Sequence, residues 1–229
     1  MLASGANANG VLGQPNFASN TGHTTHNGMF RPVGVFVDSG GRLWVADDGN
    51  HRVLCFDNAA SKANGANADG VLGQPNFTSN TGHTTQNGMS NPGYVFVDAG
   101  GRLWVGDNNN NRILRFDSAA SKANGANADG VLGQPNFTSS IQVNTQSGMT
   151  FPFGVAVDNS TGRLYVADDY NNRILVFNSA AGLPNGAKAS YVLGQTNFTT
   201  KTYGHLRNNF KCPNKCILLP GFQSFTGSG

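Results

Sequence analysis

Residues 61–77 read SKANGANADGVLGQPNF, and residues 121–137 repeat them letter for letter. The end of this stretch, VLGQPNF, also opens at Val11, and the variant VLGQTNF opens at Val192. Successive copies therefore begin 60, 60 and 61 residues apart. A fixed period of this size predicts one structural unit that is copied and stacked into a continuous array.

The composition favours strands and turns over helices. Glycine is abundant at 31 residues, and all twelve acidic residues are aspartate. Because Asp, Asn and Gly prefer turns to helix interiors, long helices are not expected.

The net charge of +3 comes from the end of the chain. Residues 1–200 hold 11 Lys and Arg against 12 Asp, and residues 201–229 add four basic residues and no acid. The repeats therefore lack the basic excess that a nucleic acid or an anionic membrane attracts, and neither is expected as a partner. The sequence also has no apolar run of about 18 residues and no secretion signal, so membrane insertion is not expected.

Each copy contains four short runs of β-branched and aromatic residues bounded by Gly, Asn, Asp or Pro, which is typical of strands. In the second copy the runs are Tyr94–Asp98, Arg102–Asp107, Arg112–Asp117 and Gly130–Gln134. The first run is apolar almost throughout, which predicts a strand buried on both faces. A β-propeller gives that burial, because each sheet lies between two others, whereas the strands of a two-sheet sandwich alternate more cleanly.

The predicted fold class is therefore all-β, with propeller blades of four antiparallel strands. Three full blades and an orphan outer strand are expected. The predicted segments are residues 1–14 (orphan outer strand of a preceding blade), 15–74 (blade 1), 75–134 (blade 2), 135–195 (blade 3) and 196–229 (an atypical basic tail).

The copies also carry the pattern P-x-G-V-x-V-D, then G-R-L-x-V-A-D, then N-H-R-V-L. It occurs at Pro32–Asp38, Gly41–Asp47 and Asn50–Leu54, and again, with Asn in place of His, at Pro152–Asp158, Gly162–Asp168 and Asn171–Leu175. Over residues ~1–200 the chain resembles NHL repeats, in particular bacterial arrays with a VLGQP-type outer strand. The second copy departs from the pattern with Tyr94, and His51 is the one copy of the family's His. The resemblance implies a propeller, commonly six-bladed, and does not imply one function.

Three blades are too few to close a propeller, for which four is about the minimum, and an open ring leaves sheet faces and edges exposed. Three explanations follow. The chain is a fragment of a longer protein, or two chains close a six-bladed ring by two-fold symmetry, or the units stack chain after chain into a fibre.

If the first strand of each blade is innermost, the long loop Pro75–Pro92 and the turn Asp107–Asn111 share one rim. The loop is rich in Thr, Ser, Asn and Gln, which suits a carbohydrate or a protein partner, and loops of this length tend to be functional. The alternative is a solvated loop packed by its own Phe77 and Met89. The candidate ligand-binding residues on this rim are Asp47, Asp48, Asn50, Asp107, Asn108, Asp168, Asp169, His23 and His83.

No metal or cofactor is expected. The Asp residues at the strand ends could bind Ca²⁺, but hydrogen bonding to turns and pairing with Arg52, Arg112 and Arg173 is the favoured role. His23 and His26 form an H-x-x-H pair that later copies do not keep, too few ligands for Zn²⁺. Cys212 and Cys216 leave a metal pair or a disulfide open.

No catalytic residue is assigned. The chain lacks a G-x-S-x-G elbow. Some enzymes that resemble NHL propellers, such as amidating lyases, use His ligands around a channel metal, and this chain has no repeated His on its strands. The predicted function is a non-catalytic binding or assembly scaffold, extracellular or at the cell surface of a bacterium, that binds protein or carbohydrate and self-associates if the chain is complete. A propeller-type lyase or hydrolase is one alternative. Another is RNA binding, against which the lack of a basic rim counts.

A further alternative is a glycosylated, fibre-forming surface protein. Four N-x-S/T sequons support it, three of them at the same position of the repeat, although N-F-T is also simply part of the copied unit. The candidate glycosylation sites are Asn76, Asn136, Asn159 and Asn197.

Overall fold

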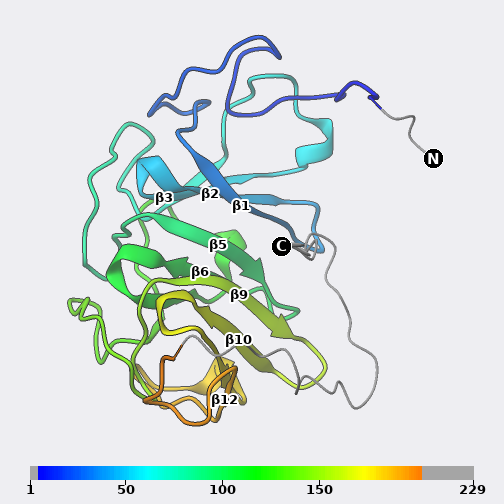
Figure 1. The fold of residues 1–229 in the computed structure, drawn as a ribbon. Helices are drawn as coiled ribbons and strands as arrows, with labels where there is room; N and C mark the ends of the chain where they lie inside the picture. Colours follow the sequence, from blue (N-terminus) through cyan, green and yellow to red (C-terminus); the bar gives the residue numbers. More distant parts are fainter. Residues whose placement is uncertain (1–4, 203–229) are drawn as a thin grey trace, which may run out of the picture.

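The computed structural model of the protein describes residues 5–202, and this part of the chain is built from strands, turns and short 3-10 helices (Figure 1). Twelve strands form three four-stranded antiparallel sheets, and each sheet is made of four consecutive strands. This order confirms the predicted all-β fold of blade-like repeats.

The first sheet consists of β1 (Pro32–Val37), β2 (Leu43–Asp47), β3 (Arg52–Phe56) and β4 (Gly70–Leu72). The second consists of β5 (Pro92–Val97), β6 (Leu103–Asp107), β7 (Arg112–Phe116) and β8 (Gly130–Leu132). The third consists of β9 (Pro152–Asp158), β10 (Arg163–Asp168), β11 (Arg173–Phe177) and β12 (Tyr191–Leu193). All three lie within the residue ranges predicted for the blades.

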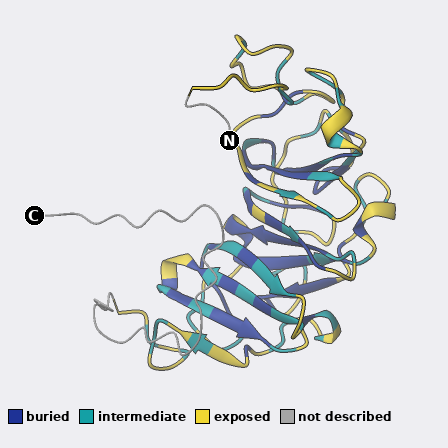
Figure 2. Cartoon of the chain, turned by 90° about the vertical axis from the view of Figure 1, so that its right-hand side faces the viewer, coloured by how far each residue is buried: buried dark blue, intermediate teal, exposed yellow. Residues whose placement is uncertain are grey.

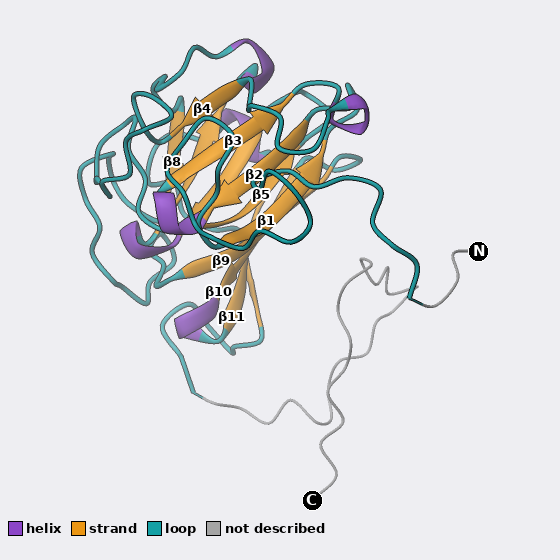
Figure 3. Ribbon diagram, turned by 90° about the horizontal axis from the view of Figure 1, so that it is seen from above, coloured by secondary structure: helices purple, strands orange, loops and turns teal. Residues whose placement is uncertain are grey.

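The sheets follow one another in space as they do along the chain (Figures 1 and 3). Strand β5 lies against β1 on one side and β9 on the other, so the first strand of each sheet is the innermost. The fourth strands lie at the opposite edge of each sheet. This is the arrangement on which the predicted rim depends.

Most of the hydrophobic core lies between the sheets, and a separate buried cluster around Val45, Leu54 and Phe56 belongs to the first sheet and its loops. At the first interface Trp44 and Leu72 pack with Val95, Leu114 and Phe116 of the second sheet. At the next interface the other face of the second sheet supplies buried residues again, namely Trp104, Ile113 and Leu132. The middle sheet is therefore covered on both faces, which explains its nearly continuous apolar strands (Figure 2).

The aspartates that follow the first strand of each sheet stabilise the turn into the second strand. Asp38 Oδ1 accepts hydrogen bonds from the Gly40 and Arg42 amides at 2.9 and 3.0 Å, and its Oδ2 accepts one from Trp44 Nε1 at 3.0 Å. Asp98 makes the same set in the second sheet. The predicted structural role of this set is confirmed.

The segment predicted as an orphan outer strand forms no strand within the described residues. The Val11 amide donates to Asn64 Oδ1 at 3.0 Å, and the Val11 carbonyl accepts from the Gly65 amide. Residues 11–14 thus lie where the outer strand of a preceding sheet would lie, but no strand between residues 5 and 202 pairs with them to form a ladder. The tail from residue 203, with Cys212 and Cys216, lies outside the described residues.

Candidate binding rim

The rim consists of the long loops 13–31, 73–91 and 133–151 together with the short 3-10 turns η1 (Asp48–Asn50), η3 (Asn108–Asn110) and η5 (Asp169–Asn171), at the left of Figure 1. Each long loop is tied to the turn of its own sheet. In the second sheet Thr84 Oγ1 donates to Asn110 Oδ1 at 2.7 Å, and Asn110 Nδ2 donates to the His83 carbonyl at 3.0 Å. The predicted juxtaposition of loop and turn is therefore present.

One fully buried arginine in each sheet holds two long loops together. Arg52 Nε donates to Asp47 Oδ2 at 2.7 Å, while Nη2 donates to the carbonyls of Thr25 and Gly28 in the preceding loop. Its Nη1 donates to the Phe77 carbonyl in the following loop. Because one guanidinium serves both loops, the position of each loop depends on the sheet between them.

The same arrangement recurs in the other sheets, where Arg112 pairs with Asp107 at 2.7 Å and Arg173 pairs with Asp168 at 2.6 Å. Both side chains of every pair are excluded from solvent. Burial raises the pKa of the three carboxyl groups, and the donors around them oppose that shift. The predicted pairing of aspartate with arginine is confirmed.

This geometry changes the role of several candidate residues. Asp47, Asp107, Asp168 and Asn50 are buried within the rim, and their polar atoms are engaged in its internal hydrogen bonds. Their side chains therefore support the internal structure of the rim, and a contact with a ligand stays a prediction. Asp48 and Asn108 are buried as well.

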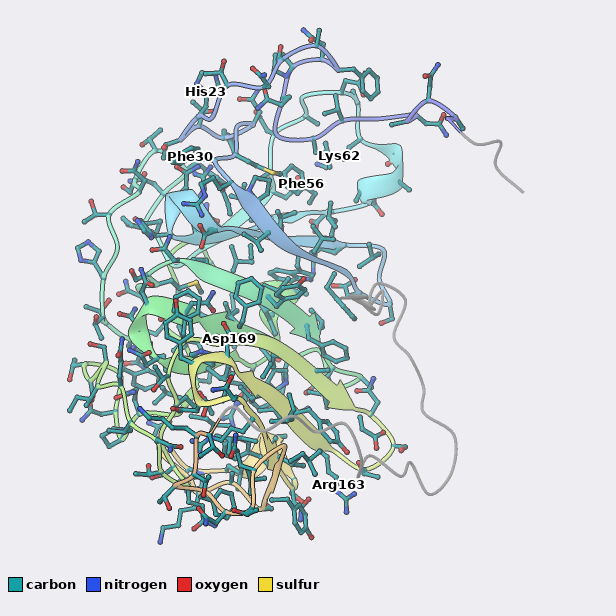
Figure 4. The ribbon with its side chains drawn as sticks, in the orientation of Figure 1. His23, Phe30, Phe56, Lys62, Arg163 and Asp169 are labelled. Carbon is teal, nitrogen blue, oxygen red and sulfur yellow. The ribbon has the colours of Figure 1, made fainter. Side chains whose placement is uncertain are left out.

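Three candidates remain accessible: His23, His83 and Asp169 are exposed. They do not converge on one place. Figure 4 shows His23 beside the first sheet and Asp169 at the third, well separated. The binding of a ligand by these three residues stays a prediction.

An aromatic cluster that the sequence reasoning missed lies where the second and third sheets meet. The rings of Phe151 and Tyr170 stack with centroids 4.8 Å apart, and Phe153 lies 6.4 Å from Phe151. Tyr94 meets Phe153 edge-on at 5.2 Å. Tyr170 is 60% exposed, and Tyr94 is exposed too. We call Tyr94, Phe151, Phe153 and Tyr170 the aromatic cluster.

A signal for this cluster was present in the sequence. All four positions depart from the residues of the other copies, as noted above for Tyr94. In the first copy the corresponding residues are Gly34, Arg31, Val33 and Gly49. Comparison of the copies therefore finds the residues, and their meeting in space requires the fold.

The four candidate glycosylation sites are exposed. The Asn76 side chain already has a local role, because its Oδ1 accepts hydrogen bonds from the Thr78 amide and hydroxyl at 2.9 and 3.0 Å. Asn16 makes the same turn with the Ala18 amide, without a sequon. Glycosylation at Asn76, Asn136, Asn159 and Asn197 stays a prediction.

Two features are absent from the described residues. No group of three or more His, Cys, Asp or Glu between residues 5 and 202 is placed to hold a metal ion. In the same range no helix has the length and apolar character needed to cross a membrane.

Comparison with known proteins identifies the repeat. The model of the NHL repeat matches residues 31–56 and 149–177. No curated protein matches the chain.

Several solved structures are similar to the chain at low identity. A streptogramin B lyase is 17% identical with a TM-score of 0.42, over 65% of this chain and 38% of that one. Virginiamycin B lyase from Staphylococcus aureus is 14% identical with a TM-score of 0.44, over 72% and 42%. A putative 6-phosphogluconolactonase from Bacteroides fragilis is 15% identical with a TM-score of 0.45, over 74% and 40%. The chain spans about two fifths of the length of each.

Proposed function

We propose that this chain, which carries NHL repeats at residues 31–56 and 149–177, is a non-catalytic scaffold that binds a carbohydrate at the aromatic cluster. The observation that carries the proposal is the meeting of four aromatic residues that depart from an otherwise copied unit. Aromatic rings that are exposed leave apolar surface in contact with water, which is unfavourable. Their concentration at one place therefore points to a ligand that covers them.

The chemistry of the surroundings favours a sugar. A pyranose ring presents C–H groups on its faces, which pack on aromatic rings, and hydroxyl groups at its edges, which need polar partners. The rim supplies such partners, because its loops consist largely of Asn, Thr, Ser and Gln with few charges. A few polar groups around an aromatic surface are typical of small-molecule sites.

The proposal is non-catalytic because the repeated carboxylates of the rim serve its internal structure. Asp47, Asp107 and Asp168 each accept hydrogen bonds from a main-chain amide, an asparagine and an arginine. A location outside the cell is part of the proposal, and the polar surface without glutamate supports it.

The test is the binding of a panel of neutral oligosaccharides, measured by calorimetry. Tyr170→Ala is expected to lower the affinity about two- to tenfold, which corresponds to the roughly 0.5–1.5 kcal/mol of an aromatic contact. Tyr94→Gly restores the repeat residue and is expected to act in the same direction. Phe17→Ala removes a ring that is as exposed but lies outside the cluster, and it should leave the affinity unchanged.

Two outcomes contradict the proposal. If no sugar binds and a protein partner is retained through Tyr170, the ligand class is wrong. Stoichiometric metal in the purified protein, together with turnover of a bound substrate, would instead favour the lyase or hydrolase alternative.

A further inference from the structure

Among residues 5–202 no sheet lies on the outer face of the first sheet or of the third. On the first sheet, Leu12 and Met29 cover the later strands, so the effect of the missing sheet is seen at the first strand, where equivalent residues measure it. Val35 of β1 is 63% exposed, whereas Val95, which has the same position in β5, is 3% exposed because the first sheet covers it. Val37 and Val97 differ in the same way. The uncovered surface around Val35 and Val37 is called the first end face.

The third sheet also exposes apolar residues, on the face that lies away from the second sheet. Leu193 of β12 is 41% exposed, whereas Leu132, at the same position of β8, is 4% exposed beneath the third sheet. Leu193 lies with Ala167 and Ile174 around a shallow hollow. Tyr191 is exposed on the same strand. These four residues form the last end face.

The two end faces match one another because the units are copies. The last end face holds the positions by which the first and second sheets contact the sheet that follows them. The first end face holds the positions by which the second and third sheets receive the sheet before them. The third sheet of one copy can therefore pack on the first sheet of another as neighbouring sheets pack within the chain.

The two ends of the chain also carry the donor and the acceptor of a hydrogen bond that is repeated between the sheets. The Asn91 amide donates to His51 Nδ1 at 3.0 Å, and the Phe151 amide donates to Asn111 Oδ1 at 2.9 Å. The next pair in this series is the Arg31 amide and the Asn172 side chain. Between residues 5 and 202 neither group has a hydrogen-bond partner. An unpaired donor is therefore present at the first end and an unpaired acceptor at the last.

The charges at the ends are opposite. Within the chain, Asn91 Nδ2 donates to Asp48 Oδ2 across the first interface at 3.3 Å. The corresponding residues of the two ends are Arg31 and Asp169. Arg31 is exposed and reaches its own Asp48 at 3.8 Å, while Asp169 is exposed and has no ion pair in the described part of the chain.

We propose that a second copy of this chain docks head to tail, with the last end face of each copy on the first end face of the other. Propellers close with about four to eight blades. Residues 5–202 of one copy supply three sheets, those of two copies supply six and those of three copies supply nine, so two copies bring a number of sheets that closes a ring. Both ends of both chains are then covered.

Docking requires residues 11–14 to leave the first sheet. Val71 and Val131 of the fourth strands each donate an amide to an asparagine of the following sheet at 3.0 Å. In a dimer, Val192 of the second copy would donate in the same way to Asn64, which now accepts from the chain's own Val11. Residues 11–14 therefore occupy the place of β12 of the second copy and compete with it.

The competition is tested by the mass of the full chain in solution over a range of concentrations. Val11→Pro removes the amide that holds the segment and leaves the end faces intact. The closed dimer has two identical interfaces, so two such hydrogen bonds are removed per dimer, and the dissociation constant should fall about five- to hundredfold. Val192→Pro is the matched control: it removes the competing donor and should raise the constant. Val35→Asp changes a residue that is exposed in the monomer and should abolish the dimer while the far-ultraviolet spectrum stays the same.

Charge reversal tests which ends meet. Arg31→Asp and Asp169→Arg should each weaken the dimer at least about twofold, and the chain that carries both should recover, because residue 31 of one copy faces residue 169 of the other. A monomer at every concentration for both wild type and Val11→Pro would overturn the proposal and leave the end faces to another protein or to further blades. A dimer that survives Val35→Asp, or a mass that grows beyond twice 24.0 kDa, would overturn it as well.

Discussion

Replacement of Arg112 by methionine tests whether the buried ion pairs hold the rim and the sheets together. In the second sheet Arg112 is enclosed, pairs with Asp107 at 2.7 Å and donates to the carbonyls of Thr85, Gly88 and Phe137. The substitution leaves Asp107 as a buried charge without its counter-ion and leaves these three carbonyls without that donor.

The size of the effect follows from the burial. Removing one partner of a buried ion pair costs about 3–5 kcal/mol, a large share of the 5–15 kcal/mol that stabilises a typical domain. For a chain of this length, the melting temperature should fall by roughly 6–20 °C. The double variant Asp107→Leu/Arg112→Met removes both charges and should recover at least half of the loss, because no unpaired charge remains.

The assay is urea unfolding followed by tryptophan fluorescence and far-ultraviolet circular dichroism. Trp44 and Trp104 are suitable reporters because they are buried at the two interfaces between the sheets. Arg31→Met, at an exposed arginine, is the control; at a protein concentration where the chain is monomeric it should change the free energy of unfolding by less than about 0.5 kcal/mol. A loss below about 1 kcal/mol for Arg112→Met, or a double variant no better than the single one, would refute the role assigned to the pair.

Two further predictions concern titratable groups. Hydrogen bonds from Ser160 and Thr161 lower the pKa of Asp158 from 3.8 to about 2, so the stability that Asp158 contributes is complete above pH 3.8 and is lost as the pH falls toward 2; Ser160→Ala/Thr161→Val should flatten this part of the stability curve, and identical curves would contradict the assignment. Burial raises the pKa of the Cys55 thiol to about 11, so in a chain whose tail cysteines are serine, iodoacetamide at pH 8 should label the folded protein far more slowly than the unfolded one, and equal rates would show that the thiol is accessible.

The sequence alone predicted the parts of the structure that depend on local pattern. Four short runs per copy became four strands, because β-branched residues between Gly, Asn and Asp turns leave the backbone few other choices. The pairing of Asp107 with Arg112 was predictable because adjacent antiparallel strands bring the two residues to the same end of a sheet.

The features that were not predicted depend on how the sheets and loops pack together in space, and a local sequence pattern does not specify that packing. Asp47 and Asp107 were candidates for ligand contact, yet the long loops close over them and exclude solvent. The aromatic cluster arises from residues of β5, β9, η5 and a loop, and their rings meet because the second and third sheets pack together. Residues 11–14 carry a strand sequence but form no ladder, since a strand needs a partner as well as a pattern.

The central claim is that residues of the first strands, such as Val95, are buried by the neighbouring sheet and not by their own unit. The most direct test compares Val95→Ala with Val35→Ala, the same substitution at equivalent positions, at a protein concentration where the chain is monomeric. Val95→Ala should lower the free energy of unfolding by about 2 kcal/mol, because it removes two buried carbons, whereas Val35→Ala should change it by less than about 0.5 kcal/mol. Equal losses at the two positions would contradict the claim.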